Sequence, residues 1–226
     1  MNSSDFRAYK STFRAAIRAT IAEARPGSLD EAAFPAYSHR NPLINWLFWQ
    51  RLRVVMKFIE RVAPFERALD FGCGSGVLLP FLAKHSERVL GLDVDLLAFQ
   101  LISRRPEFPR NVEVRDAAGT PLESLPATSF DIITALDVLE HVDDLSATLR
   151  GLIRLLKPGG RLVVSGPTEN IFYKIGRRVA GREYSGAYHE RGIPEVRAEL
   201  AKRTRVSTIA RLYPPIALFD IFVGEV

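Results

Sequence analysis

Short apolar runs alternate with longer helix-compatible segments through the middle of the chain, between residues 66 and 165. The runs have the composition of strands, and they cover residues 67–71, 88–92, 112–115, 131–135 and 161–165. Segments with the length and pattern of helices lie between most of them, at residues 77–85, 96–104 and 145–156. Such alternation builds a parallel sheet with right-handed crossovers. The sequence therefore predicts an α/β fold.

The flanking segments have a different texture. Residues 6–25 and 42–62 carry apolar side chains at helical spacing, which predicts an N-terminal helical cap over residues 1–65. Residues 166–205 are rich in Arg, Gly and Tyr, and they are expected to form a lid inserted into a core of residues 66–226. Two closing strands are predicted at residues 206–212 and 218–223. A chain of 226 residues has the length of one such domain, to which the cap also belongs.

Composition excludes several classes of protein. The chain is 47% hydrophobic and 25% charged, as expected for a globular protein and not for a disordered one. Its single cysteine, Cys73, cannot form an internal disulfide, and no run of about 18 apolar residues predicts a membrane span. With no secretory signal pattern at residues 1–10, a cytoplasmic location is expected. The net charge of +5 suits an anionic ligand or surface.

A glycine-rich turn follows the first predicted strand, within the sequence LDFGCGSG of residues 69–76. Glycines there allow unusual backbone angles and let a ligand approach the main chain. Helix N-terminal N–H groups next to such a turn suit a polar or anionic ligand group. The turn alone is weak evidence for a nucleotide site, since a structural turn uses the same residues.

An acidic residue at the end of the second predicted strand strengthens that interpretation. Asp93 has the position from which a carboxylate accepts hydrogen bonds from the two ribose hydroxyls of a nucleoside cofactor. Asp116, after the third strand, is a candidate for the adenine amino group, or else a turn residue. Asp70, two residues before Gly72, would repel a pyrophosphate but would receive an ammonium group. The charges thus favour S-adenosylmethionine over NAD.

Five segments carry a resemblance to the class I S-adenosylmethionine-dependent methyltransferases. They are LDFGCGSG (69–76), GLDVD (91–95), RDAAGTPL (115–122), SFDIITALDVLEHVDD (129–144) and LIRLLKPGGRLVVSGP (152–167). The resemblance implies a Rossmann-like, seven-stranded, mostly parallel sheet flanked by helices, with the last strand antiparallel. It also implies S-adenosylmethionine at the carboxyl edge of the first half of the sheet, with S-adenosylhomocysteine as product.

The same resemblance assigns the cofactor-binding residues one by one. Asp70 and Gly72 would face the methionine part, Gly74 the ribose side, and Asp93 the ribose itself. Further assignments place Val94 beside the adenine, Asp116 and Ala117 at its edge, and Leu136 near the sulfonium. Cys73 belongs to this loop as a small filler and is not expected to act as a nucleophile. Apart from the resemblance, the positive charge of Arg51 or Arg53 makes either a candidate partner for the cofactor carboxylate.

Two histidines are the candidate catalytic residues. Methyl transfer to a hydroxyl needs a base, and His141 or His189 could supply one. His141 could equally order the loop after the fourth strand. Together with Asp137 and Glu140 it forms a near match to a divalent-metal group of quinone-ring O-methyltransferases, but a metal is not favoured.

The phrase Leu139-Glu140-His141-Val142 is closest to the ubiquinone and menaquinone methyltransferases and their relatives. This resemblance implies O-methylation of a small-molecule acceptor. Methylation at carbon or nitrogen, or a binding module without transferase activity, remain alternatives. The basic, aromatic segment 166–205 would suit an aromatic, quinone-like or lipid-like acceptor, and peripheral contact with a membrane is compatible with it. The Asn-Pro-Pro-Tyr type motif of amino-directed DNA methyltransferases is absent, so a nucleic-acid substrate is disfavoured. The sequence does not indicate an oligomeric state.

Overall fold

The computed structural model describes residues 2–23, 37, 42–104, 108–168, 192–213 and 218–226. Seven strands form one sheet in the order β3-β2-β1-β4-β5-β7-β6. They are β1 (Phe65–Phe71), β2 (Ser86–Asp93), β3 (Val112–Asp116), β4 (Phe130–Leu136), β5 (Leu156–Pro167), β6 (Arg205–Leu212) and β7 (Phe219–Glu225). β7 runs antiparallel to both of its neighbours, β5 and β6, whereas the pairs among β1 to β5 are parallel. The predicted mostly parallel sheet with a reversed last strand is confirmed.

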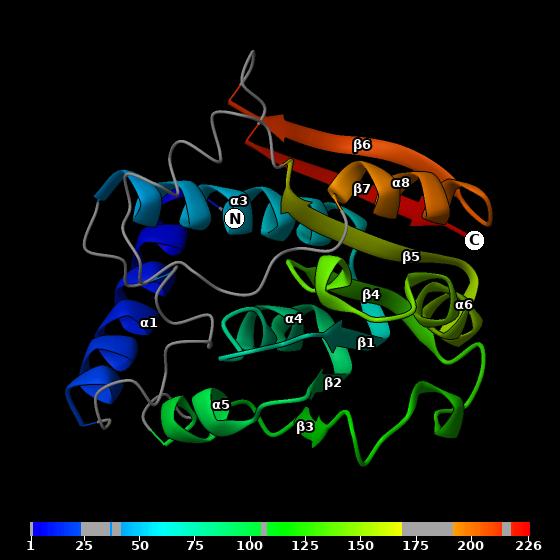
Figure 1. The fold of residues 1–226 in the computed structure, drawn as a ribbon. Coiled ribbons are helices and arrows are strands. Elements are labelled where there is room, and N and C mark those ends of the chain that lie inside the picture. Colours follow the sequence, from blue (N-terminus) through cyan, green and yellow to red (C-terminus); the bar gives the residue numbers. More distant parts are fainter. Residues whose placement is uncertain (1, 24–36, 38–41, 105–107, 169–191, 214–217) are drawn as a thin grey trace.

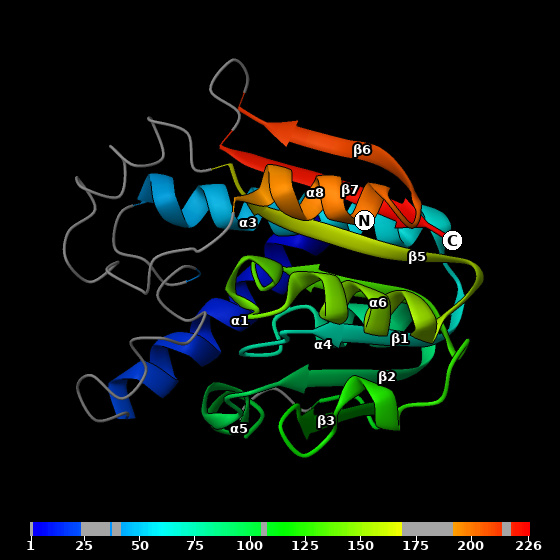
Figure 2. The same ribbon diagram turned by 45° about the vertical axis from the view of Figure 1, so that its right-hand side comes forward.

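Helices cover both faces of the sheet, as Figures 1 and 2 show. One face carries α1 (Ser3–Glu23), α3 (Pro42–Val62), α4 (Leu79–His85) and α5 (Leu97–Ile102), and the other carries α6 (Leu145–Leu155) and α8 (Ile193–Ala201). Two short 3₁₀ helices, η1 (Leu122–Ser124) and η2 (Leu139–His141), lie in loops beside the strands. The arrangement is a three-layer α/β sandwich.

Alternation along each strand divides the apolar side chains between two cores. Ala68 in β1 and Ile132 in β4 point toward α3 and α4, whereas their neighbours Leu69 and Ile133 point toward α6. Successive side chains of a strand face opposite sides of the sheet, so both faces of these strands are apolar. This double burial explains the continuous apolar runs in the sequence.

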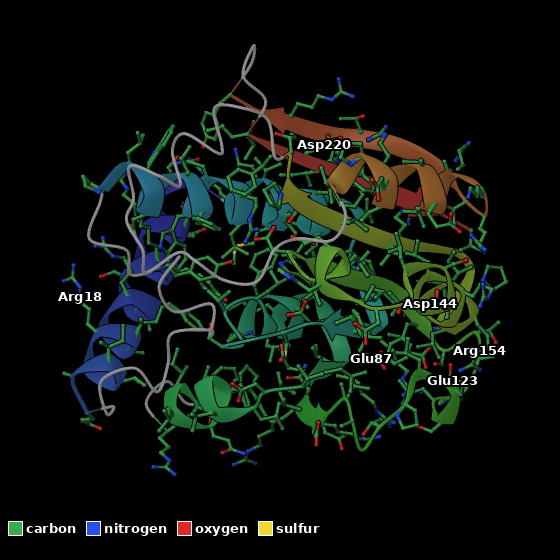
Figure 3. The ribbon with its side chains drawn as sticks, viewed as in Figure 1. Arg18, Glu87, Glu123, Asp144, Arg154 and Asp220 are labelled. Carbon is green, nitrogen blue, oxygen red and sulfur yellow. The ribbon has the colours of Figure 1, made fainter. Side chains whose placement is uncertain are left out.

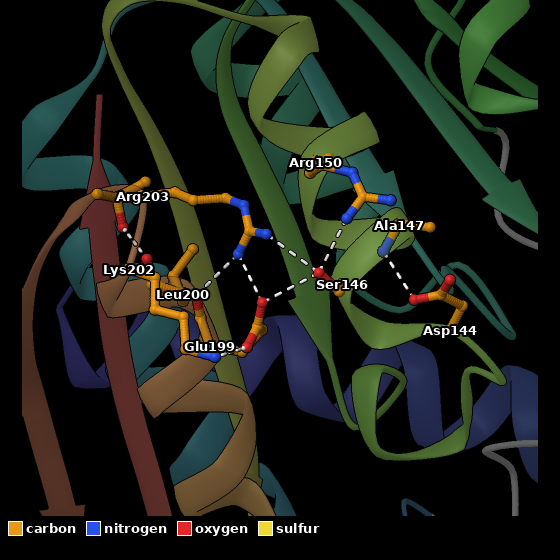
Figure 4. A network of polar contacts seen from close by, with 9 residues as sticks. Asp144, Ser146, Ala147, Arg150, Glu199, Leu200, Lys202 and Arg203 are labelled. Carbon is orange, nitrogen blue, oxygen red and sulfur yellow. Dashed lines mark hydrogen bonds and ion pairs between the residues drawn. The ribbon is translucent and has the colours of Figure 1, made fainter.

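The segment between β5 and β6 differs from the expected lid. Residues 193–201 form α8, which packs against the sheet through buried Ile193, Val196 and Leu200. Glu199 of α8 accepts a hydrogen bond from Ser146 of α6 at 3.1 Å, and Arg203 donates to the same carboxylate at 2.6 Å (Figure 4). This stretch is therefore a sheet-covering helix, and the rest of the predicted lid, residues 169–191, lies outside the described residues.

The amino-terminal helix α1 is amphipathic, as predicted. Its side chains Phe6, Phe13 and Ile17 are buried against the domain, while Arg7 and Arg18 are exposed. Figure 3 shows Arg18 extending away from the body of the molecule. Among the described residues, no helix combines the length and apolar character needed to cross a membrane.

Candidate functional site

The glycine-rich turn leaves the carboxyl end of β1 and is fastened to the end of β2. The carbonyl of Leu92 accepts hydrogen bonds from the N–H groups of Gly72 at 2.8 Å and Cys73 at 3.1 Å. Gly72, Gly74 and Gly76 have φ values of 74°, 50° and 74°. Residues other than glycine rarely adopt such backbone angles, so the path of the backbone requires glycine at these three positions.

Gly72 has a second constraint, which the sequence did not reveal. A Cβ atom added to it would lie 2.5 Å from Cγ2 of Val138, in the turn that follows β4. Two strand-end turns, after β1 and after β4, therefore meet at this glycine. They form neighbouring walls at the carboxyl edge of the sheet, since β1 and β4 are adjacent parallel strands.

Asp93 points toward the glycine turn. Its Oδ2 accepts a hydrogen bond from the N–H of Gly74 at 2.6 Å, and its Oδ1 accepts one from the N–H of Asp95 at 3.0 Å. The side chain is partly exposed, so each oxygen retains acceptor capacity for a further donor. The structure thus brings together the turn and the acid that the sequence paired by spacing.

Three further predicted residues lie beside Asp93. Asp116 is its register partner on β3, and the N–H of Ala117 donates to the Asp93 carbonyl at 2.8 Å. The Asp116 carboxylate accepts from Ala118 N–H at 2.9 Å in a turn, so both of its sequence interpretations remain compatible with the structure. Val94 is 81% exposed, which is unusual for a valine and leaves an apolar surface next to the acids.

Asp70 is buried inside this edge of the sheet, with 4% of its surface exposed. Burial raises the pKa of its carboxyl to about 7, a hydrogen bond from Thr134 acts to lower it, and the nearby charge of Asp93 raises it further. The Thr134 hydroxyl donates to Oδ1 of Asp70 at 2.6 Å. Thr134 was missed by sequence reasoning, although it is the register partner of Asp70 on β4. Only the strand pairing could have identified it.

Cys73 is buried next to these acids. Burial, together with the charges of Asp70 and Asp93, raises the pKa of its thiol above the ordinary value. A thiol in this environment stays protonated at neutral pH and is a poor nucleophile. This geometry agrees with its expected role as a small filler in the turn.

Comparison with known proteins adds the family. A family model described as a methyltransferase domain matches residues 47–206, which is well over half of the chain. The chain belongs to the methyltransferase domain family. Its fold is that of S-adenosylmethionine-dependent methyltransferases.

Individual relatives of this methyltransferase-family chain share about a third of its residues over the matched region. A ubiquinone biosynthesis O-methyltransferase of Pseudomonas fluorescens Pf0-1 is 33% identical over 144 residues, which covers 62% of the chain and 57% of the relative. The corresponding protein of Paracidovorax citrulli is 31% identical over 159 residues, 68% of the chain and 66% of the relative. The chain therefore spans less than two thirds of the length of these relatives.

Solved structures show the same architecture. The N-methyltransferase NodS from Bradyrhizobium japonicum WM9, in complex with S-adenosyl-L-homocysteine, superposes with a TM-score of 0.59 at 19% identity. That match covers 95% of the methyltransferase-family chain and 98% of NodS. At this identity the likeness establishes the fold.

The turn after β4 is not α-helical. Asp137 has φ +54°, and Leu139–His141 form the 3₁₀ helix η2, so His141 does not follow Asp137 on an α-helical turn. Glu140 is buried and His141 is exposed. Within the described part of this methyltransferase fold, no group of three or more His, Cys, Asp or Glu side chains is placed to hold a metal ion. His189 lies outside that part.

The side chain of Arg51 reaches the same turn from α3. Its guanidinium is buried, forms an ion pair with Asp137, and donates a hydrogen bond to the Tyr37 hydroxyl at 3.1 Å. Leu136, the predicted neighbour of the sulfonium, ends β4 immediately before Asp137 and is partly buried. The structure thus gives the predicted cofactor-carboxylate ligand a partner within the protein.

Proposed function

We propose that this chain transfers a methyl group from S-adenosylmethionine to an oxygen atom of a small-molecule acceptor. The observation that carries the proposal is a pair of carboxylates at the ends of β1 and β2: Asp70, buried just before the glycine turn, and Asp93, which accepts a hydrogen bond from Gly74 in that turn. The relatives named as ubiquinone biosynthesis O-methyltransferases support oxygen as the methylated atom and a quinone-like acceptor.

The residues present fit this cofactor. Asp70 would accept the ammonium group of the methionine part, and the positive charge of that group would favour the ionised carboxylate. Asp93 keeps acceptor sites for the ribose hydroxyls beside the turn. The exposed Val94 offers an apolar surface for the adenine, with Asp116 and Ala117 at its edge. NAD fits less well, because a buried acid behind the turn disfavours a pyrophosphate.

When bound, the cofactor supplies an electrophilic methyl group on a sulfonium. The chain then has to orient the acceptor in line with that methyl and to exclude water. Leu136 would provide an apolar wall at the end of β4. His141, exposed on η2 in the turn that follows β4, is the described histidine that could take a proton from an acceptor hydroxyl at this edge of the sheet. His189 remains a second candidate.

The test combines binding with turnover. S-adenosylmethionine carrying a labelled methyl group would be incubated with the chain and either a phenol bearing an apolar tail or an aniline of the same shape. We expect label on the phenol oxygen, identified by mass spectrometry and NMR. The Asp93→Ala variant should lose turnover, whereas Glu113→Ala, which changes an exposed acid on β3, should retain it.

Other outcomes would change the proposal in defined ways. Label on the aniline or on a ring carbon would reassign the methylated atom. Tight binding of S-adenosylhomocysteine without turnover on either probe, or with a cell extract, would indicate a binding module. Label on macromolecules would overturn the small-molecule acceptor.

A further inference from the structure

A buried ion pair joins the amino-terminal helical region to the carboxyl edge of the sheet. Arg51 lies on α3 and Asp137 follows the last residue of β4, and their side chains are in contact. Arg51 is only 2% exposed. A charge removed from water in this way is stable only with a close partner, so Arg51 depends on Asp137, whose own side chain is 23% exposed.

Aromatic rings fix the position of the guanidinium. It lies over the ring of Phe48 at 5.2 Å and over that of Phe219 at 5.5 Å, both measured to the ring centre. The Tyr37 hydroxyl accepts a hydrogen bond from Nη2. The planar guanidinium thus has stacking partners and an acceptor in addition to Asp137, an arrangement that a lysine could not reproduce.

Asp137 in turn fixes the backbone beside the glycine turn. Its φ of +54° is unfavourable for most residues and tolerated by Asp and Asn. Its N–H donates to the Ser165 carbonyl of β5 at 2.9 Å. The next residue, Val138, is the one whose side chain excludes a Cβ at Gly72. Where Asp137 is held therefore determines how closely Val138 approaches the glycine turn.

We propose that Arg51 is a positioning residue that acts through Asp137. Its ion pair holds the turn after β4 in place, and that turn sets the wall facing the methionine part of the donor site. The inference rests on the proposed function, because it assumes that the glycine turn binds S-adenosylmethionine. It assigns Arg51 to the protein's own Asp137 in place of the cofactor carboxylate.

The two roles of Arg51 predict opposite effects of removing the Asp137 charge. If Arg51 serves the cofactor carboxylate, Asp137→Asn frees the guanidinium and strengthens binding of S-adenosylhomocysteine. If Arg51 acts through Asp137, the same change weakens binding. Asparagine suits this test because it retains the size of aspartate and its tolerance of positive φ.

The experiment measures dissociation constants for S-adenosylhomocysteine and for adenosine by calorimetry. Adenosine has the ribose and adenine but lacks the methionine part, so it reports on the Asp93 side of the site alone. The variants are Arg51→Met, Asp137→Asn and the double variant. Arg61→Met is the matched control, because Arg61 also lies over a phenylalanine ring of α3 but is exposed at the far end of the helix.

Each single variant should weaken S-adenosylhomocysteine binding on the order of tenfold, while adenosine binding changes little. The double variant should bind no more weakly than the weaker single variant, because the two side chains act as one unit. Arg61→Met should match the wild type. A general loss of folding would lower the affinity for both ligands together, and circular dichroism would detect it.

Three results would overturn the proposal: stronger or unchanged S-adenosylhomocysteine binding in Asp137→Asn, additive losses in the double variant, or parallel losses for both ligands in variants whose circular dichroism matches the wild type. Failure of the proposed function itself looks different. In that case the wild-type chain would bind neither S-adenosylhomocysteine nor S-adenosylmethionine, whatever residues occupied positions 51 and 137.

Discussion

Asp70 is a residue whose charge state depends strongly on its surroundings. Its pKa of about 7 places ionisation near neutral pH, whereas an unfolded chain would ionise it near 3.8. Between these values the folded protein binds a proton that the unfolded chain has lost. The contribution of Asp70 to stability therefore falls as pH rises from about 4 to 7 and stays low above 7. A buried acid that costs stability at neutral pH is typical of a binding site.

The Asp70→Asn variant separates the effect of the Asp70 charge on stability from its effect on ligand binding. Asparagine can still accept the Thr134 hydrogen bond, so the variant should be more stable than the wild type at pH 8 and nearly equal to it at pH 4. Denaturant unfolding at both pH values measures this. Binding of S-adenosylhomocysteine should strengthen from pH 6 to 8 in the wild type and lose this dependence in the variant. A wild-type stability that rises over the same range relative to the variant would contradict the expectation.

Gly72 allows a second prediction at the scale of single residues. The Gly72→Ala change adds a methyl group 2.5 Å from Val138 Cγ2 and forces alanine to φ +74°. We expect a loss of about 3 kcal/mol in the free energy of unfolding, from overpacking and backbone strain together. Adding Val138→Gly should recover part of this loss, because it removes both close atoms of Val138, Cγ2 and the Cβ at 2.6 Å, but not the strain. No recovery in the double variant would place the whole cost in the backbone.

At the scale of elements, Glu199 belongs to the polar contacts that join α6 and α8. Hydrogen bonds from Lys202 and Arg203 hold the pKa of its carboxyl at about 2, below the ordinary value of 4.5. A lowered pKa means that the stabilisation is present above about pH 4.5 and is lost as pH falls toward 2. Figure 4 shows Ser146 of α6 joined to this carboxylate.

The Glu199→Gln variant should unfold with a weaker dependence on pH between 5 and 2 than the wild type does. Acid titration followed by circular dichroism measures the difference. Glu123→Gln, which changes a surface acid of η1 (Figure 3), is the control and should follow the wild-type curve. Identical curves for all three proteins would show that the α6–α8 link does not depend on the Glu199 charge.

Helices and strands were predictable from the sequence wherever the spacing of their own apolar residues was regular. Strands β1, β2 and β4 were found because each carries a run of consecutive buried apolar residues, and α3 because its apolar stripe is broad. Helix α8 was not found, because its short apolar pattern is embedded in a segment rich in Arg, Gly and Tyr. The 3₁₀ form of η2 was also missed, since the positive φ of Asp137 depends on contacts with β5 and Arg51.

The candidate site shows the same division between local and distant signals. Asp70, Asp93 and the glycines stand at fixed spacings along the chain, so the sequence alone predicted that they would meet. Thr134 and the partner of Arg51 lie far from them in sequence and become neighbours only through strand pairing and helix packing. Contacts of that kind carry no local pattern.

At the scale of the whole molecule, α1 connects the amino-terminal region to the glycine turn. The Tyr9 hydroxyl donates to the carbonyl of Val77, just after the turn, at 2.5 Å. Aromatic rings of α1 also contact rings of other elements. The ring centres of Phe6 and Trp49 are 6.1 Å apart, and those of Phe13 and Phe108 are 6.5 Å apart. The site is therefore supported by a helix that precedes the region matched by the family model.

Deleting residues 1–23 should lower the free energy of unfolding by at least about 3 kcal/mol, because it uncovers a surface that several large apolar side chains bury. Binding of S-adenosylhomocysteine should weaken as well, because the turn loses the support of Tyr9. Thermal unfolding with and without ligand measures both effects. Arg18→Ala, which shortens a side chain that points into solvent, is the control. Unchanged stability after the deletion would show that α1 docks only weakly.

The exposed Val94 has a calorimetric consequence. In the free protein, water covers this apolar side chain almost completely. A nucleobase that lies against it would release that water, and the release of water from apolar surface lowers the heat capacity of the system. The enthalpy of cofactor binding would then become more exothermic as the temperature rises, and shortening Val94 to alanine would reduce that slope. The heat capacity of binding would thus report whether the cofactor covers this exposed side chain.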